Sequence, residues 1–161
     1  MTPLIRPYQA QDRAACAAVF YRAVREGAAE QYSAEQRAAW APEGKPDTAT
    51  PDRLLDQHCW VAEQNGQITG FMSLTPSGYL DMAFVLPEAK GKGVADALYR
   101  ALMARAKQDK LAKLTVHASH GARHFFEKHG WQVDHREQHP INGQTLERFQ
   151  MSLISKDNKH E

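Results

Sequence analysis

The stretch Lys90–Gly93 alternates two lysines with two glycines, between an apolar run and an amphipathic run. A tight turn needs only one glycine, so the second glycine and the two charges indicate that an anion comes close to the backbone. The first turn of a helix offers unpaired N–H groups and partial positive charge, which bind phosphate well. The stretch therefore predicts a strand, a glycine turn and a phosphate-binding helix start, or else an ordinary strand-to-helix turn. It matches neither GxGxxG nor GxxxxGKS/T.

A second candidate for chemistry is the run Tyr79–Val85, in which Asp81 carries the one charge. Side chains alternate along a strand, so Tyr79, Asp81, Ala83 and Val85 would share a face. A charged residue within an apolar strand is often functional, which makes Asp81 a candidate for acid–base catalysis. The competing interpretation is that Asp81 only fixes a loop or a basic neighbour by a hydrogen bond. Tyr79 is a candidate acid or substrate contact, or a half-exposed aromatic at the start of a strand.

The histidines and cysteines point to no metal and no disulfide. His120 and His124 are four residues apart, as metal ligands on a helix can be, but no third ligand stands at a matching spacing. The sequence therefore predicts no metal site. Cys16 and Cys59 stand alone, without a CxxC, and predict two reduced, partly buried thiols.

Alternating strands and helices must position these residues. The expected strands are residues 4–6, 59–64, 68–74, 79–85, 113–118, 131–137 and 145–153. The expected helices are one capped by Asp12 that ends near Glu26, one from a Ser33–Gln36 capping box to Trp40, one after Gly93, and one over 122–130. Asn65-Gly66 between two strands predicts a tight hairpin.

Composition sets the outer bounds. The chain has 161 residues, of which 42% are apolar and 24% are charged, which is typical of one globular domain. Its net charge of +1 gives no overall electrostatic attraction to nucleic acid or to an anionic membrane. No apolar stretch approaches the ~20 residues of a membrane span, and the first residues lack the apolar centre of a signal peptide, so we expect a cytoplasmic protein. We expect a domain over 1–154 and a polar tail over 155–161.

Two segments together resemble the GNAT acetyltransferases. Val85–Leu98 resembles motif A of that family, an apolar strand with V-x-P followed by R/Q-x-x-G-x-G/A. His117–Trp131 resembles motif B, in which a strand leads to A-x-x-F-Y-x-x-x-G-F. The two segments lie in the family's order and at its spacing, and the resemblance covers nearly the whole chain. The front half is similar to a bacterial single-domain subgroup of the family.

The resemblance implies a fold and an acyl-CoA site. The implied fold is α/β (α+β): a mixed, mostly antiparallel twisted sheet flanked by helices, splayed between its fourth and fifth strands. The implied co-substrate is acetyl-CoA, whose pantetheine arm runs along the fourth strand and whose pyrophosphate lies on the glycine turn. The residues implied to contact it are Ala83, Phe84, Val85, Lys90, Gly91, Lys92, Gly93, Val94, Ala95, Ser119 and Phe126.

The chain departs from the family's pattern at two positions. The usual Arg or Gln at the start of the glycine turn is Lys90, which should bind nearly as well because backbone amides make most of the contact. The motif B tyrosine, which protonates the leaving thiolate in many relatives, is Phe126, and phenylalanine has no proton to donate. In the family the base often lies on the fourth strand, so Asp81 is the first candidate base and Tyr79 the alternative acid.

The resemblance also implies a substrate pocket and an activity. Tyr32 and Trp40 would lie on a short second helix that covers the acceptor pocket, either lining the pocket or packing the helix onto the sheet. The expected activity is direct transfer of an acetyl group from acetyl-CoA to a primary amine of a small molecule. The alternatives are acetylation of a protein N-terminus or lysine, and a non-catalytic acyl-CoA-binding module. A homodimer is possible, and no nucleic acid or membrane partner is expected.

Overall fold

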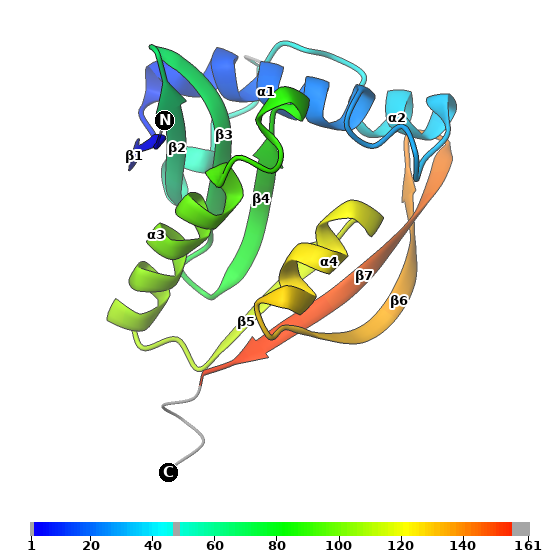
Figure 1. Ribbon diagram of the computed structural model, residues 1–161. Helices are drawn as coiled ribbons and strands as arrows, with labels where there is room; N and C mark the ends of the chain where they lie inside the picture. The colour runs from blue at the N-terminus through cyan, green and yellow to red at the C-terminus, as the bar shows by residue number, and fades with distance from the viewer. Residues whose placement is uncertain (1, 47–48, 156–161) are drawn as a thin grey trace.

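A seven-stranded sheet in the order β1-β2-β3-β4-β5-β7-β6 forms the centre of the molecule (Figure 1). The computed structural model describes residues 2–46 and 49–155, so most of the expected tail lies outside the described residues. The strands are β1 Leu4–Pro7, β2 His58–Gln64, β3 Gln67–Leu74, β4 Tyr79–Val85, β5 Lys113–Ala118, β6 Gln132–Ile141 and β7 Gln144–Ile154. All neighbours are antiparallel except β4 and β5, so the predicted mixed, mostly antiparallel sheet is confirmed.

Helices cover both faces of the sheet. They are α1 Arg13–Arg25, α2 Ala34–Trp40, α3 Val94–Gln108 and α4 His120–Lys128, with single 3₁₀ turns η1 Ala10–Asp12, η2 Arg53–Asp56 and η3 Pro87–Ala89. Phe84 of β4 packs on Phe20 of α1, with ring centroids 4.8 Å apart. The next residue, Val85, lies beside Val94 of α3 near Gly70. Successive strand residues point to opposite faces, so α1 and α3 lie on opposite sides of β4.

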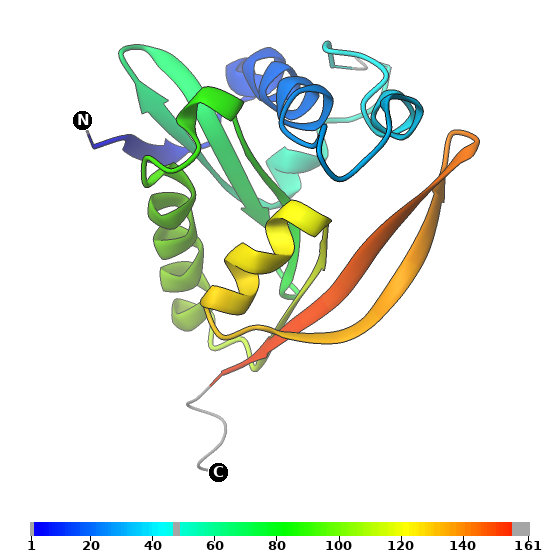
Figure 2. The same ribbon diagram turned by 45° about the vertical axis from the view of Figure 1, so that its right-hand side comes forward.

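The sheet splits between β4 and β5. These two strands pair only through Tyr79–Thr115 and Leu80–Val116, and they separate beyond that point. In Figure 2, α4 lies between α3 and the long β6–β7 hairpin, on the β5 side of the split. The splay predicted between the fourth and fifth strands is therefore present.

A bulge interrupts β4 just where the split begins. Ser73 of β3 pairs with Met82, whereas the next residue, Leu74, pairs with Leu80. Asp81 is thus an extra residue without a partner on β3. The predicted alternation, with Asp81 on the face of Ala83, is wrong, because a bulge shifts the facing of the residues on one side of it.

Two Asn-Gly turns close the hairpins. Asn65 and Gly66 adopt φ values of 53° and 77°, and the predicted hairpin between β2 and β3 is confirmed. Asn142 and Gly143, with φ values of 45° and 82°, make the same turn between β6 and β7. The sequence interpretation ended the sixth strand at Glu137, four residues before Ile141.

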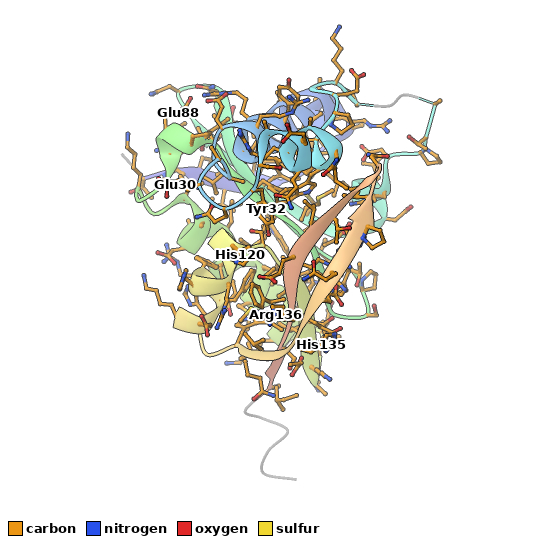
Figure 3. All side chains as sticks on the ribbon, turned by 90° about the vertical axis from the view of Figure 1, so that its right-hand side faces the viewer. Glu30, Tyr32, Glu88, His120, His135 and Arg136 are labelled. Carbon is orange, nitrogen blue, oxygen red and sulfur yellow. The ribbon has the colours of Figure 1, made fainter. Side chains whose placement is uncertain are left out.

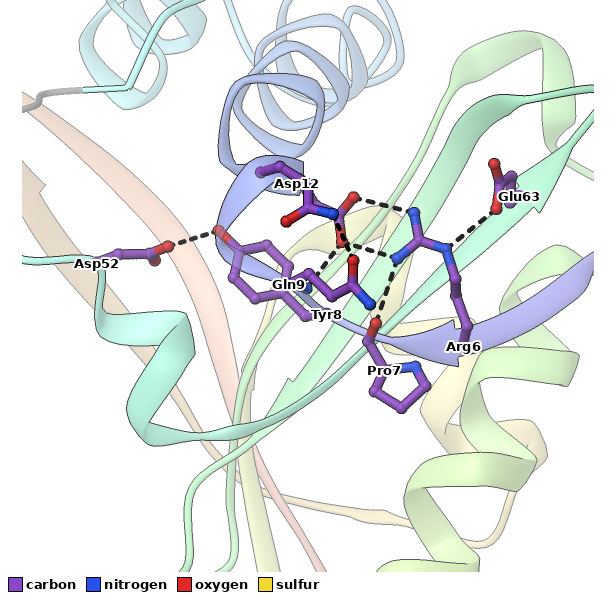
Figure 4. A network of polar contacts seen from close by, with 8 residues as sticks. Arg6, Pro7, Tyr8, Gln9, Asp12, Asp52 and Glu63 are labelled. Atoms are coloured by element: carbon purple, nitrogen blue, oxygen red, sulfur yellow. Dashed lines mark hydrogen bonds and ion pairs between the residues drawn. The ribbon is translucent and has the colours of Figure 1, made fainter.

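Asp12 stands at the predicted N-cap position of α1, but its side chain makes no capping hydrogen bond to the helix. Its carboxylate instead accepts hydrogen bonds from both terminal nitrogens of Arg6, at 2.8 and 2.9 Å, and from the backbone N–H of Gln9 at 2.8 Å (Figure 4). The Arg6 guanidinium holds the pKa of this carboxyl below its ordinary value. Because Arg6 also contacts Glu63 at 3.0 Å, the network ties β1 to the start of α1 and to β2. The predicted Ser33–Gln36 capping box of α2 is confirmed.

The core lies between the sheet and its helices. Its most enclosed side chains include Phe71, Leu74, Leu80, Leu98 and Leu102. Cys16 and Cys59 are buried free thiols, as predicted, and burial raises the pKa of Cys16 to about 12. Within the described residues, no helix combines the length and the apolar character that crossing a membrane requires.

Candidate active site

A cavity of about 260 Å³ follows the edge of β4 that β5 leaves open. Nine residues that the sequence predicted for the site form part of its wall: Tyr32, Trp40, Ala83, Phe84, Val85, Lys90, Ala95, Ser119 and Phe126. The rest of the wall was missed: Ala23, Val24, Gly27, Ala28, Gln31, Met72, Gly121, Ala122 and Phe125. Most of the missed residues are small or apolar, so only the packing of α1 and α4 beside β4 identifies them.

The backbone of β4 presents unpaired groups to this cavity. The N–H of Met82 donates to Oγ of Ser73 at 3.2 Å, and the N–H of Leu86 donates to the carbonyl of Thr69 at 2.8 Å. Both acceptors lie on the β3 side. Because N–H groups alternate along a strand, those of Ala83 and Val85 point to the open side. An extended ligand can therefore add here like a strand.

The glycine turn leaves free space outside its backbone. Gly91 and Gly93 adopt φ values of 75° and 81°, and a Cβ built on either of them would meet no atom within 4 Å. These glycines are therefore required by backbone conformation rather than by packing against the protein. Gly93 is the N-cap of α3, and no side chain caps that helix end, so its first-turn N–H groups stay available to an anion.

The turn lies at one end of the cavity. Lys90 and Ala95 are wall residues, whereas the residues between them, Gly91 to Val94, form the turn without lining the cavity. The Lys90 ammonium donates a hydrogen bond to the carbonyl of Gly27 at 3.2 Å, which brings it to the C-terminal end of α1. A positive charge thus stands where the cavity meets the turn.

Tyr32 and Trp40 close the other end of the cavity. Tyr32 lies just before Ser33, the N-cap of α2, and not on the helix as predicted. Its hydroxyl donates to the carbonyl of Glu147 at 2.6 Å and accepts from the N–H of His120 at 3.2 Å (Figure 3). Burial raises its pKa. The Trp40 ring lies 5.6 Å from that of Tyr32 and 6.2 Å from that of Phe84, so both residues pack as well as line the wall.

Asp81 and Tyr79 lie outside the cavity wall. The Asp81 carboxylate is 3.0 Å from Nε of Arg53 and accepts a hydrogen bond from the Gln57 amide at 2.8 Å. These contacts tie the bulge in β4 to η2 and its end. The Tyr79 ring lies 5.5 Å from the ring of His117 on β5. Burial, and then the Asp81 charge, raise the pKa of Tyr79, so its hydroxyl keeps its proton at neutral pH.

Comparison with known proteins identifies this arrangement. The family description "Acetyltransferase (GNAT) domain" matches residues 28–153, more than half of the chain. The chain is 37% identical to the uncharacterized N-acetyltransferase YafP of Escherichia coli, over 91% of this chain and 93% of that protein. The chain belongs to the GNAT acetyltransferase family. The predicted resemblance, including its YafP-like subgroup, is thereby confirmed.

Solved GNAT structures share the fold. The chain superposes on a GCN5-related N-acetyltransferase from Rhodopseudomonas palustris with a TM-score of 0.90 and 34% identity, over 96% of this chain and 97% of that one. The PaiA N-acetyltransferase of Thermoplasma acidophilum, solved in complex with coenzyme A, superposes with a TM-score of 0.76 at 18% identity, over 96% of this chain and 100% of that one. The second likeness shows the fold alone.

Phe126 and Ser119 of GNAT motif B occupy defined places. Phe126 is 1% exposed, and its ring lies 5.0 Å from that of Trp131. Ser119 is the N-cap of α4, and its hydroxyl accepts from the N–H of Ala122 at 3.2 Å. Both residues line the cavity, while each also serves the packing or capping of α4.

Sequence reasoning missed a cluster of charged and polar side chains on β5, β6 and β7. Nδ1 of His117 lies 2.8 Å from Oε1 of Glu137, and Nε of Arg148 donates to the same oxygen at 2.5 Å. The GNAT motifs do not single these residues out, and only the strand order brings them together. The predicted helix pair His120 and His124 is separate from them, and His120 contacts Glu147 at 3.0 Å. The described residues hold no group of three or more potential metal ligands.

Proposed function

We propose that this GNAT protein moves an acetyl group from acetyl-CoA to a primary amine of a small molecule, by direct transfer in a ternary complex. The observation that carries the proposal is the cavity along the open edge of β4, which runs from the glycine turn to Tyr32 and Trp40. Neither Cys16 nor Cys59 lines it, so no thiol stands ready to carry the acetyl group. The cavity lining therefore favours direct attack of the amine on the thioester over a mechanism in which an enzyme cysteine first carries the acetyl group.

The residues present fit acetyl-CoA as a substrate. The outward N–H groups of Ala83 and Val85 suit the amide-containing pantetheine arm, and the N–H of Val85 can donate to the oxyanion that forms during transfer. The turn with Gly91 and Gly93 suits the pyrophosphate, since it combines a free helix N-terminus with open space. Lys90 adds positive charge at the same place.

The covered end of the cavity favours a small acceptor over a protein. Besides the Tyr32 contact with β7, the Gln36 amide donates to the carbonyl of Thr145 at 2.9 Å, and the Asn142 amide donates to the carbonyl of Ala39 at 2.7 Å. These bonds fasten α2 to the tip of the β6–β7 hairpin (Figure 1). A roof of this kind leaves more room for a compact amine than for a polypeptide.

Acid–base roles complete the proposal. The attacking amine must lose a proton, and the departing thiolate can accept one. Tyr79 is the proposed donor, because its raised pKa keeps the hydroxyl protonated. The base predicted from the sequence is Asp81, and its contacts with Arg53 and Gln57 also support the alternative of a structural tether.

Thiol release from acetyl-CoA tests the proposal. The acceptors are butylamine, phenethylamine, spermidine and glycinamide, with a lysine-containing decapeptide as the protein mimic. We expect release with at least one small amine and none above background with the peptide. Release with the peptide alone would support a protein acetyltransferase. Binding of acetyl-CoA without release from any acceptor would support the non-catalytic module, for which Phe126 is the sequence argument.

A further inference from the structure

We propose that His117, with the Glu137 carboxylate beside it, accepts the proton of the acceptor amine. The inference deepens the proposed acetyl transfer and rests on it. It assigns the base to β5, on the side of the split opposite Asp81, and it gives the charge of Glu137 an electrostatic role. Four observations support it: the place of His117 in the split, the face it occupies, its carboxylate partner and the charges around it.

His117 lies where β4 and β5 part. The last residue pair between the strands is Leu80–Val116. The residues that follow, Asp81 on β4 and His117 on β5, therefore flank the point where the strands diverge. A ligand that adds to the open edge of β4 ends its strand-like pairing at this point. His117, like Asp81 and Tyr79, lies outside the cavity wall, and these side chains flank the point where such a ligand would end.

The side chain of His117 faces away from the core. Its neighbours Val116 and Ala118 are 4% and 1% exposed and belong to the core, so strand alternation directs His117 to the other face of β5. Its side chain keeps 26% of its surface exposed. The imidazole is thus half-buried, which allows an acceptor or one bridging water to reach it.

Glu137 stands beside the ring, although its carboxylate lies off the direction in which an Nδ1–H would donate. Its Oε1 lies 2.8 Å from Nδ1 of His117, and Arg148 holds the same carboxylate from the paired strand β7. A carboxylate beside Nδ1 favours the tautomer with the proton on Nδ1 and leaves the lone pair on Nε2. That lone pair is what a general base needs.

The surrounding charges keep the imidazole neutral. Burial lowers the pKa of His117 from its ordinary value, the Arg148 charge lowers it further, and the Glu137 charge opposes both. The other titratable groups near it are Tyr79 from β4 and His139 from β6, and His135 of β6 contacts the far oxygen of Glu137 at 3.4 Å. At neutral pH the ring is therefore mainly in the unprotonated form that can accept a proton.

Asp81 is held by side chains of η2 and of the residue that follows it. One of its oxygens is 3.0 Å from the Arg53 guanidinium and 2.8 Å from the Gln57 amide. The other lies 3.4 Å from Arg53. Both oxygens of this carboxylate are therefore engaged by neighbouring side chains.

The proposed transfer begins with a neutral amine and the thioester of acetyl-CoA. The nitrogen lone pair forms a bond to the thioester carbonyl carbon, and the C–S bond breaks with its electron pair on sulfur. The nitrogen gives its surplus proton to Nε2 of His117. The thiolate takes a proton from Tyr79, and the imidazolium proton restores the Tyr79 hydroxyl through water. The products are the N-substituted acetamide and coenzyme A thiol.

The first test removes the imidazole. His117→Asn keeps a polar side chain of similar size, and His124→Asn, at a side chain that is 87% exposed on α4, is the matched control. With the panel amine that gives the fastest release, we expect His117→Asn to lower turnover about 10²-fold, as for loss of a positioned base. The affinity for acetyl-CoA should stay near that of the wild type, and His124→Asn should leave turnover unchanged within about twofold.

The second test separates a base from a merely structural histidine. The pH profile of kcat should fall on the acid side as His117 takes up its proton. Glu137→Gln removes a charge that raises the His117 pKa, so this limb should move to lower pH. Arg148→Gln removes a charge that lowers it, so the limb should move to higher pH. The acceptor's own pKa is the same in every variant, and a structural role would move neither limb.

The outcomes distinguish the inference from the proposed function. Wild-type protein that neither binds acetyl-CoA nor releases thiol would overturn the proposed function, and the inference with it. Active wild type with His117→Asn within a few-fold of its turnover would overturn the inference alone. Shifts of the acid limb in the same direction for Glu137→Gln and Arg148→Gln would also overturn it.

Discussion

Two ionisable side chains, Asp81 and His117, flank the point where β4 and β5 part, and their surroundings differ. Asp81 stands in a bulge and is held by Arg53 and Gln57. His117 stands in a regular strand, half-buried, with one ring nitrogen 2.8 Å from a carboxylate oxygen. The contrast favours a structural task for the first side chain and proton transfer for the second.

Asp81→Asn tests whether Asp81 stabilises the fold rather than accepting a proton. The amide keeps the size of the side chain but loses the charge that attracts Arg53. We expect the free energy of unfolding to fall by about 1 kcal/mol, typical of a half-exposed charged contact, and turnover to fall less than tenfold. Thermal unfolding and steady-state kinetics check this. A loss of turnover of about 10²-fold at unchanged stability would instead support Asp81 as the base.

Phe126→Tyr tests whether a missing acid limits the reaction. The added hydroxyl enters a position that is 1% exposed, so we expect a loss of about 1 kcal/mol of stability and little change in turnover. Phe71→Tyr, at a buried ring outside the cavity wall, is the control for the cost of burying a hydroxyl. A tenfold rise in turnover for Phe126→Tyr would contradict the assignment of Tyr79 as the proton donor.

At the scale of elements, the β4 bulge and the β6–β7 hairpin shape the site. The bulge ends the regular pairing of β4 beside its split from β5. The hairpin reaches back to α2, so that residues more than 100 positions apart make the roof of the cavity. Both features depend on pairing between strands rather than on the residues of one strand.

Tyr32→Phe tests whether the attachment of α2 to the β6–β7 hairpin, which forms the roof of the cavity, determines acceptor binding. It leaves the buried carbonyl of Glu147 without this donor and the N–H of His120 without this acceptor, which should cost about 1–3 kcal/mol of stability. We expect a larger rise in KM for the amine than for acetyl-CoA, because α2 is loosened from β7. Tyr21→Phe, at a half-buried ring of α1 that Arg25 covers, is the control. Unchanged stability and an unchanged KM for the amine would exclude the roof as a determinant of acceptor binding.

Sequence patterns predicted the elements whose signals are local. The capping box at Ser33 and the turn at Asn65-Gly66 depend on residues within a few positions of each other, and both are present. Asn142-Gly143 has the same local signal and was recognisable. Aspartate is a residue type that favours the N-cap position, but the carboxylate of Asp12 is taken up by hydrogen bonds from Arg6 of β1. A local sequence pattern does not show this contact.

The site was predictable where backbone conformation dominates. The glycine turn, β4 and Phe126 followed from motifs and lie where the motifs imply. The α1 wall and the His117–Glu137 contact were not predictable, because they depend on distant strands and helices coming together. The role of Asp81 is the clearest example, since a bulge in the pairing with β3 determines where its side chain points.

At the scale of the whole molecule, the split sheet makes one continuous path from the glycine turn to the covered acceptor end. Residues of α1, β4, α3 and α4 line that path, so its shape depends on the complete fold rather than on one motif. The central claim is that acetyl-CoA occupies this path with its pyrophosphate on the turn.

Calorimetric titration of acetyl-CoA into wild type and three variants tests this claim most directly. Gly93→Val would place a branched side chain in the open space outside the turn, at a φ of 81°. Gly66→Val carries the same kind of backbone strain, at a φ of 77° in a distant hairpin, and controls for it. We expect one site in the wild type, affinity more than about tenfold weaker for Gly93→Val, about two- to fivefold weaker for Lys92→Ala, and unchanged for Gly66→Val. Equal affinities for wild type and Gly93→Val would contradict the claim.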